Sequence, residues 1–184
     1  MAEQLEEVDP DVVELLLEAA ENGQLDQVRQ CITEMKVDPN VADDEGWRTI
    51  HLAAGAGHLD IVRALVNEFG VDPLSLDNDG QTALHWAALR GEMAAVRLMI
   101  EEYKVDPDIA DFEGDRPLHL AIPRAHLGII RYLLRTKRVD TNAKNSEGLT
   151  AVQIADKLYD PHSKKKVKEL LSSGGEMASD NGKH

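Results

Sequence analysis

Apolar residues recur along the chain in short helical stripes that turn-forming segments separate. In the stretch 59–68, Leu59, Val62 and Leu65 are spaced so that they share one face of a helix. A shorter run, 49–54, precedes it, and a glycine-containing stretch, 55–57, separates the two. Residues 70–73, Gly-Val-Asp-Pro, then break the second stretch. The pattern predicts two short helices and a turn.

The same punctuation returns every 34 residues. The aligned positions include Gly46, Gly80, Gly114 and Gly148; His51, His85 and His119; Ala19, Ala53, Ala87, Ala121 and Ala155; Val28, Val62, Val96 and Ile130; and Val37, Val71, Val105 and Val139. Because two helices cannot bury an apolar stripe alone, neighbouring units must stack. We therefore predict an all-α repeat solenoid over residues 12–171, with units at about 12–42, 43–76, 77–110, 111–144 and 145–171.

Three runs carry a further resemblance. Residues 49–54 (TIHLAA), 82–88 (TALHWAA) and 116–121 (RPLHLA) resemble the ankyrin signature T-P-L-H-x-A, and the likeness covers nearly the whole chain. It implies stacked helix-turn-helix units with connecting hairpins. The fourth unit departs from the others, because Pro123 and Ala125 stand where the second unit has Gly55 and Gly57. We expect the first helix of that unit to end early.

The ends of the chain differ from the repeats. Residues 1–11 are acidic and residues 172–184 are small and polar, so we expect both segments to be disordered. The first unit and the last, which contains Lys164–Lys168, have the polar character of terminal caps. With caps at both ends, we expect an elongated monomer.

Charge divides the chain more sharply than the net value of −14 suggests. Residues 1–115 hold 27 Asp or Glu against 7 Lys or Arg, whereas residues 116–171 hold 12 Lys or Arg against 5 Asp or Glu. In an elongated chain this predicts a charge dipole. The acidic part favours a basic protein partner. The basic end leaves an alternative open, direct binding of nucleic acid or of an anionic membrane.

Catalytic and metal chemistry find little support. Neither phosphate-loop motif, G-x-G-x-x-G nor G-x-x-x-x-G-K-[ST], occurs, and the carboxylates fall mostly in turns, where solvation explains them. The repeated histidines stand about 10 Å apart in such a stack, too far for one zinc ion, so we expect each to hydrogen-bond the turn that starts its helix. Cys31 shares its repeat position with apolar residues, which predicts a buried, inert thiol. We expect no enzyme activity and no cofactor.

The ankyrin resemblance implies that a partner lies on the hairpin tips and the exposed side of the first helices. By position, the candidate binding residues are Asp44, Glu45, Trp47, Asn78, Asp79, Gln81, Leu89, Arg90, Phe112, Glu113, Asp115 and Arg124, with Ser146, Glu147 and Leu149 at the last tip. The rings of Trp47 and Phe112 are the candidate anchors. The alternative is that each ring folds back on a neighbouring hairpin. Trp86 shares its position with aliphatic residues, which predicts at least half burial.

Two basic features remain. Arg29, Arg63, Arg97, Arg131 and Lys165 recur at the repeat spacing, and we expect a solvated face supported by near neighbours such as Asp26 and Asp60. The run Lys164–Lys168 is either a nuclear-import signal or the polar side of a last helix. A single cysteine, an acidic start and the lack of a bilayer-length apolar stretch favour a cytoplasmic or nuclear protein.

Overall fold

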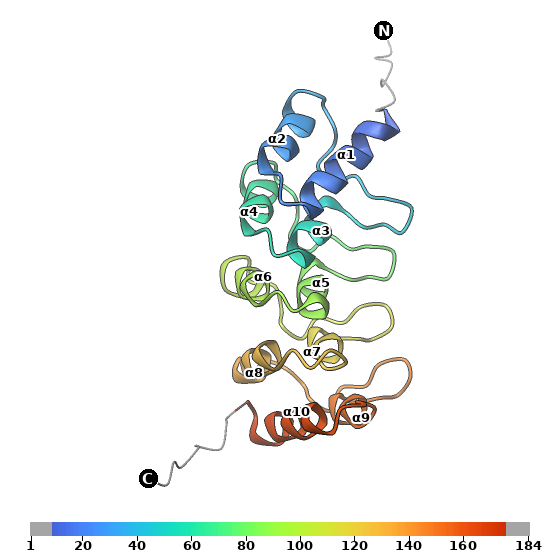
Figure 1. Cartoon of the computed structure of the whole chain (residues 1–184), viewed down its shortest axis with the longest axis vertical. Coiled ribbons are helices and arrows are strands. Elements are labelled where there is room, and N and C mark those ends of the chain that lie inside the picture. Colours follow the sequence, from blue (N-terminus) through green and yellow to red (C-terminus); the bar gives the residue numbers. More distant parts are fainter. Residues whose placement is uncertain (1–8, 176–184) are drawn as a thin grey trace.

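A computed structural model describes residues 9–175, which form a stack of helix pairs with the two ends of the chain at opposite ends of the stack (Figure 1). The helices are α1 (Pro10–Glu21), α2 (Leu25–Thr33), α3 (Thr49–Gly55), α4 (Leu59–Asn67), α5 (Ala83–Arg90), α6 (Met93–Arg97) with a π-helical continuation (Leu98–Glu102), α7 (Pro117–Ala121), α8 (Leu127–Arg135), α9 (Ala151–Asp156) and α10 (Pro161–Ser173). Within these residues the β pairing is a single bridge between Ala42 and Arg48. The predicted all-α repeat solenoid is confirmed.

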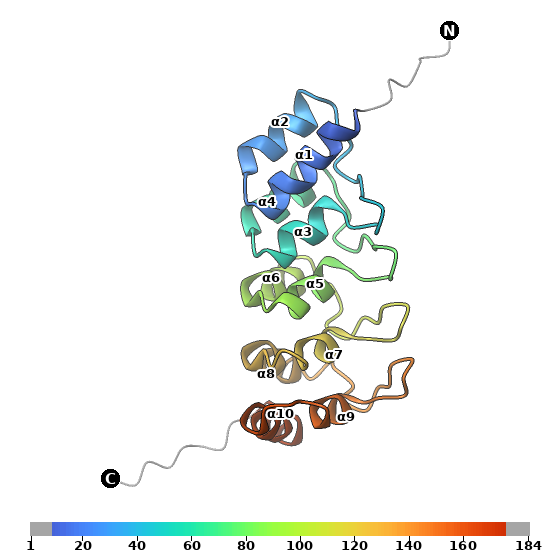
Figure 2. The same cartoon turned by 45° about the vertical axis from the view of Figure 1, so that its right-hand side comes forward.

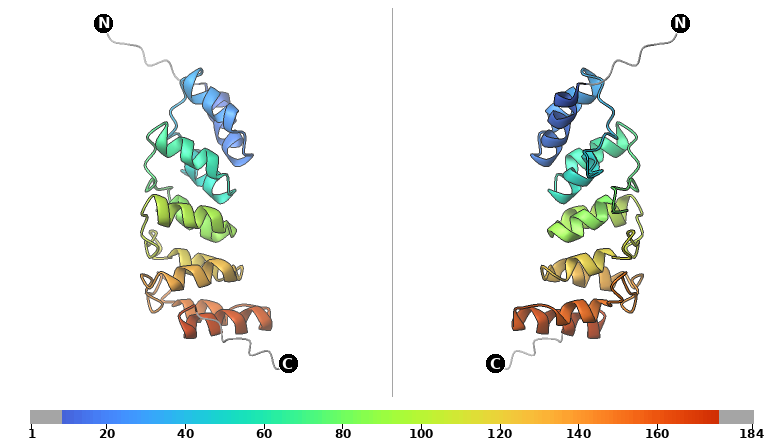
Figure 3. Two further views of the ribbon diagram at one scale, coloured as in Figure 1. Left: turned by 90° about the vertical axis from the view of Figure 1, so that its left-hand side faces the viewer. Right: turned by 90° about the vertical axis from the view of Figure 1, so that its right-hand side faces the viewer.

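The first helices of the units form one layer and the second helices another. Helices α1, α3, α5, α7 and α9 pack against one another in order, and α2, α4, α6, α8 and α10 lie beside them (Figures 1 and 2). The side views show that the helix pairs are stacked along the long axis (Figure 3). Long loops that end in tight turns project beside the first layer, where they join one unit to the next (Figure 2). Each unit after the first therefore offers a hairpin tip and one face of a first helix on the same side.

The core consists of the repeated apolar positions. Leu16, Ile50 and Leu84 occupy one repeat position and are fully buried, and Leu118 at the next is nearly so. Cys31 is buried at the position shared with Leu65, Met99 and Leu133 in a continuous cluster, and burial raises the pKa of its thiol. None of the described helices combines the length and apolar character that a bilayer crossing requires.

Both ends of the helical stack extend past the expected boundaries. The Asp9 side chain accepts a hydrogen bond from the amide of Asp11 (3.1 Å), and Pro10 suits the first helical turn, so α1 begins before Val12. At the other end α10 continues to Ser173, where Gly174 adopts a left-handed conformation and its amide bonds the Leu170 carbonyl. The expected disorder of residues 9–11 and 172–175 was therefore wrong. Its remainder, residues 1–8 and 176–184, lies outside the described residues.

The fourth unit is distorted where the sequence predicted it. Helix α7 ends at Ala121, whereas α3 and α5 continue to Gly55 and Arg90. Ala125 takes a left-handed backbone conformation (φ 52°), which is costly for a residue with a Cβ. The turn still closes in the usual way, because the amide of His126 donates to the Ala121 carbonyl at 3.1 Å.

Candidate partner-binding groove

Each hairpin tip is held by a carboxylate or amide at its first position. The Oδ1 atoms of Asp43, Asp77, Asp111 and Asn145 accept hydrogen bonds from the amides of Trp47 (2.7 Å), Gln81 (2.8 Å), Asp115 (2.8 Å) and Leu149 (3.0 Å). Asp77 and Asp111 are buried. Their interpretation as solvated turn residues was wrong for this position. They accept bonds that the turn backbone would otherwise lack, and this fixes the shape of the tips.

The repeated histidines hydrogen-bond the loops that carry the tips. Nδ1 of His51 accepts from the amide of Arg48 (3.1 Å), and its Nε2 lies 2.9 Å from the Ser75 carbonyl of the next loop. Nδ1 of His85 accepts from the amide of Thr82 (3.1 Å), and its Nε2 lies 3.3 Å from the backbone carbonyl of Asp115 in the next loop. Burial lowers the pKa of each repeated histidine, that of His85 to about 4. The predicted bond to the helix start is confirmed, and Nε2 carries the proton that it donates onward.

The Trp47 ring folds towards the first helix of the third unit and remains half-buried. It meets Trp86 edge-on, with ring centroids 4.8 Å apart at 73°. Trp86 is buried, as its repeat position predicted, and its Nε1 donates to Asp77 Oδ2 at 2.8 Å. Leu17 and Leu52 complete a small apolar cluster with Trp86, separate from the main core. The alternative that the Trp47 ring folds back on its surroundings therefore holds in part, since the ring packs on a neighbouring unit.

Phe112 both contacts the neighbouring hairpin and remains largely exposed. Its amide donates to the Asp79 carbonyl (3.0 Å), and its ring covers Gly80, where an added Cβ would lie 2.5 Å from the ring. The side chain nevertheless stays 72% exposed. Phe112 thus caps the neighbouring tip with one face and leaves much of its surface in water.

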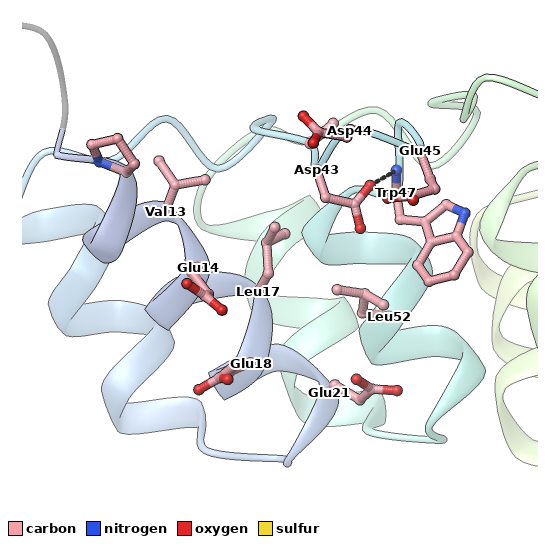
Figure 4. A pocket seen from close by; sticks show the side chains of 12 residues that line it. Val13, Glu14, Leu17, Glu18, Glu21, Asp43, Asp44, Glu45, Trp47 and Leu52 are labelled. Atoms are coloured by element: carbon pink, nitrogen blue, oxygen red, sulfur yellow. Dashed lines mark hydrogen bonds between the residues drawn. The ribbon is translucent and has the colours of Figure 1, made fainter.

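An open groove of about 650 Å³ lies between α1, the first hairpin tip and α3 (Figure 4). Its apolar lining includes Pro10, Val13, Leu17, Trp47 and Leu52, and its acidic lining comprises Glu14, Glu18, Glu21, Asp43, Asp44 and Glu45. The groove therefore joins an apolar surface to a concentration of negative charge.

The structure brings only some of the predicted site residues into this groove. Asp44, Glu45 and Trp47 line it, as the tip positions implied. Sequence reasoning missed the glutamates of α1, because the first unit was interpreted as a polar cap. The spacing of Glu14, Glu18 and Glu21 places them on one helical stripe, and this was the available signal.

Most of these carboxylates lack a cationic partner. Glu21 Oε1 lies 3.0 Å from Arg90 Nη1, and Asp43 accepts from the backbone of the tip. In the part of the chain that the structure describes, Glu14, Glu18, Asp44 and Glu45 form no ion pair with lysine or arginine; they are all solvent-exposed.

Arg90 pairs with Glu21 of the groove but is not itself part of the groove lining. Its guanidinium lies 5.3 Å from the centroid of the Trp86 ring while it pairs with Glu21. Gly55 packs against both side chains, because a Cβ added there would lie 3.2 Å from Trp86 and 3.3 Å from the Arg90 side chain. An arginine from the third unit thus reaches across the second unit to the first.

The other predicted site residues are absent from the groove lining and bind mainly within the stack. Asn78 donates to the Asp44 carbonyl (3.1 Å), and Gln81 donates to Asp111 (3.1 Å). Further pairs are Asp115 with Asn145 (2.9 Å), Glu113 with Ser146, and Arg124 with the carbonyl of the half-buried Leu89 (3.0 Å); Asp79 is exposed at its tip. These residues connect successive units.

The basic residues of the second layer pair across units. Arg29 meets Glu68 at 2.6 Å and Arg63 meets Glu102 at 2.7 Å, so the direct partners of these arginines are glutamates of the next unit. Asp26 and Asp60 act on Arg29 as weaker, more distant charges that help to raise its pKa. Hydrogen bonds from these arginines lower the pKa of both glutamates.

The lysine run lies on α10. Lys168 pairs with Asp156 (2.8 Å) and Lys165 approaches Glu169 (3.9 Å). The run therefore forms the polar side of the last helix, while its role in nuclear import stays a prediction.

Two family models match the chain. A model of ankyrin repeats in three copies matches residues 15–111, and a model of ankyrin repeats in many copies matches residues 99–155. No curated protein gives a significant match. Ankyrin repeats generally mediate protein–protein interaction and are typically non-catalytic. The first match spans more than half of the sequence and includes most of the groove, so this chain belongs to the ankyrin-repeat family.

Proposed function

We propose that this protein is a non-catalytic binding module whose groove between α1 and the first hairpin tip holds a basic segment of another protein. The observation that carries the proposal is the set of unpaired carboxylates beside an apolar floor. Oligomeric state and cellular location belong to the same proposal: an elongated monomer in the cytoplasm or nucleus.

Electrostatics favours a cationic occupant. Glu14 and Glu18 are separated by one helical turn, where like charges destabilise a helix by about 0.2–0.5 kcal/mol. Glu45 and Asp44 add charge from the facing tip (Figure 4). A basic segment relieves this repulsion, and the acidic surface around the groove accelerates its encounter.

The apolar floor indicates that charge alone is not what the groove recognises. Val13, Leu17 and Leu52 lie between the acidic side chains, and Trp47 closes one side. Partly exposed tryptophans are frequent anchors in protein interfaces. We expect the bound segment to alternate basic and apolar residues.

Fluorescence anisotropy with a labelled peptide that alternates arginine or lysine with leucine tests the proposal. Reversing the exposed pair Glu14→Lys and Glu18→Lys should weaken binding about tenfold or more, with a smaller loss in high salt. The matched control, Glu34→Lys with Glu169→Lys, changes net charge equally, but Glu34 directly follows α2 and Glu169 lies on α10. Equal losses in the two variants would show that only net charge matters and would contradict the groove.

A labelled DNA duplex and anionic lipid vesicles test the alternative of binding through the basic end. We expect neither to bind, because Lys168 and Lys165 already have carboxylate neighbours and the whole chain carries −14. Binding of either that is abolished by Lys164→Glu with Lys166→Glu would favour the alternative function.

A further inference from the structure

One carboxylate of the groove already has a cationic partner within the chain. The groove extends along the whole of α1, since the first and last residues of that helix, Pro10 and Glu21, both belong to its lining. Glu14, Glu18 and Glu21 follow one another down this helix (Figure 4). Of these three, Glu21 is the one that pairs with lysine or arginine among the described residues, with Arg90 Nη1 at 3.0 Å. The negative charge of the groove is therefore compensated at the carboxyl end of α1 and uncompensated along the rest of it.

Arg90 is held beside Glu21 by contacts in three successive units. Its guanidinium carbon lies 5.3 Å from the centroid of the Trp86 ring in its own unit. Its side chain packs on Gly55 of the second unit, where an added Cβ would lie 3.3 Å from Arg90 Cδ. The repeat position of Gly55 carries Glu21 in the first unit and Leu89 in the third, so a glycine in the unit between them leaves Arg90 room to reach the first. The placement of Arg90 thus depends on packing as well as on charge.

We propose that Arg90 is a specificity-determining residue of the groove: it occupies the Glu21 carboxylate as an internal cation and confines the basic residues of the partner to the rest of the acidic lining. A cation of the partner that approaches Glu21 has to displace Arg90 and meets its positive charge at close range. Juxtaposed like charges disfavour a register that places a basic residue there. The inference rests on the proposed function, because it states which part of the same groove recognises positive charge.

Arg90→Gln frees the Glu21 carboxylate and keeps a polar side chain at position 90. In anisotropy with the labelled peptide that alternates lysine with leucine, this variant should bind about threefold more tightly than wild-type protein, a gain in the range of an exposed ion pair. The matched control is Arg124→Gln, which changes net charge equally at the same repeat position of the next unit. Arg124 donates to the Leu89 carbonyl (3.0 Å) and is absent from the groove lining, so its substitution should change the affinity less.

A double-mutant cycle isolates the pair from the effect of net charge. Glu21→Gln should weaken peptide binding more in the Arg90→Gln background than in wild-type protein, because the carboxylate is free to contact the peptide only in that background. Both side chains of the pair are partly exposed, 35% for Arg90 and 47% for Glu21, so we expect all four proteins of the cycle to fold, which thermal melts check. If Arg90→Gln does not fold, Arg90→Met keeps an unbranched stem against Trp86 and replaces it in the cycle.

The outcomes separate the two proposals. Equal gains in Arg90→Gln and Arg124→Gln, or equal losses from Glu21→Gln in the two backgrounds, would show that net charge alone acts and would overturn the role of Arg90. The basic-segment groove stands in that case if Glu14→Lys with Glu18→Lys still weakens binding. Failure of the peptide to bind both wild-type protein and Arg90→Gln would overturn both proposals.

Discussion

The first three units, through Ala110, and the last two units use the same internal bonds but join their neighbours differently. Among the first three, Arg29–Glu68 and Arg63–Glu102 bridge successive second helices, and Arg90 bridges the first helices to Glu21. At the next step the position equivalent to Glu102 is Thr136, and Arg97 pairs instead with Glu101 of its own helical segment (3.0 Å).

The groove follows the same division. Unpaired carboxylates and the tryptophan pair lie in the first three units, whereas the tips of the last units are occupied by contacts such as Asp115–Asn145 and Lys157–Glu147 (3.0 Å). The last units also contain the shortened α7 and the left-handed Ala125. One fold thus supports an acidic groove in the first units and a distorted helix pair in the fourth, because the residues that differ are those that the core does not require.

The largest expected effect comes from the core of the fourth unit. Leu118→Ala should cost about 2–5 kcal/mol, as for other buried leucines. Since this unit also contains the shortened α7 and the left-handed Ala125, it should unfold first, and unfolding by urea should separate into two steps. Both tryptophans lie in the second and third units, so their fluorescence should report the later step and circular dichroism both. Coincident curves would show that all units unfold together.

Acid should destabilise the folded protein through its buried histidines. Burial lowers the pKa of His85 from 6.5 to about 4, so below 6.5 the unfolded chain binds a proton that the folded chain does not. Stability from this residue is full above pH 6.5, falls as the pH drops towards 4, and the loss reaches about 3 kcal/mol. His119 should contribute less, because the Asp115 carboxylate 3.5 Å away favours its charged form.

The comparison of His85→Gln and His119→Gln measures this difference. Denaturant midpoints between pH 7 and 4 should depend less on pH in His85→Gln than in His119→Gln. The opposite order would mean that the carboxylate near His119 does not offset its burial.

A third comparison concerns the buried acids of two tips. Asp77→Asn places an amide N–H opposite the Trp86 indole N–H or the tip backbone, and leaving one donor unmatched should cost about 1–3 kcal/mol. Asp111→Asn should cost less than about 1 kcal/mol, because the partner Gln81 can turn its amide and accept. Thermal melts of both variants check the order. Equal costs would show that turn nucleation dominates.

The smallest effect tests the missing bridge. Thr136→Glu restores the repeat position that Glu68 and Glu102 occupy and gives Arg97, which already lies over the Tyr132 ring, a carboxylate partner in the next unit. The gain should be at most about 0.5 kcal/mol, since exposed ion pairs contribute little. Thr136→Gln is the matched control without charge. If both variants are equally stable at low salt, the bridge does not join the units measurably.

The sequence by itself determined the repeat, the all-α class, the buried apolar positions of the repeat and the early end of α7. These follow from local rules: helical spacing of apolar residues, the proline at 123, and recurrence that only stacking satisfies. The hydrogen bond that His51 accepts from the amide at its helix start was also predictable, because both groups lie within one turn of the chain.

Only the tertiary structure decided which surface of the stack is open. It paired Arg29 with Glu68 rather than Asp26, turned Trp47 towards Trp86, and placed the glutamates of α1 opposite the first tip. These contacts join residues of different units, often more than 30 positions apart. Their choice depends on how neighbouring units are offset in space, and a spacing along the chain does not contain that offset.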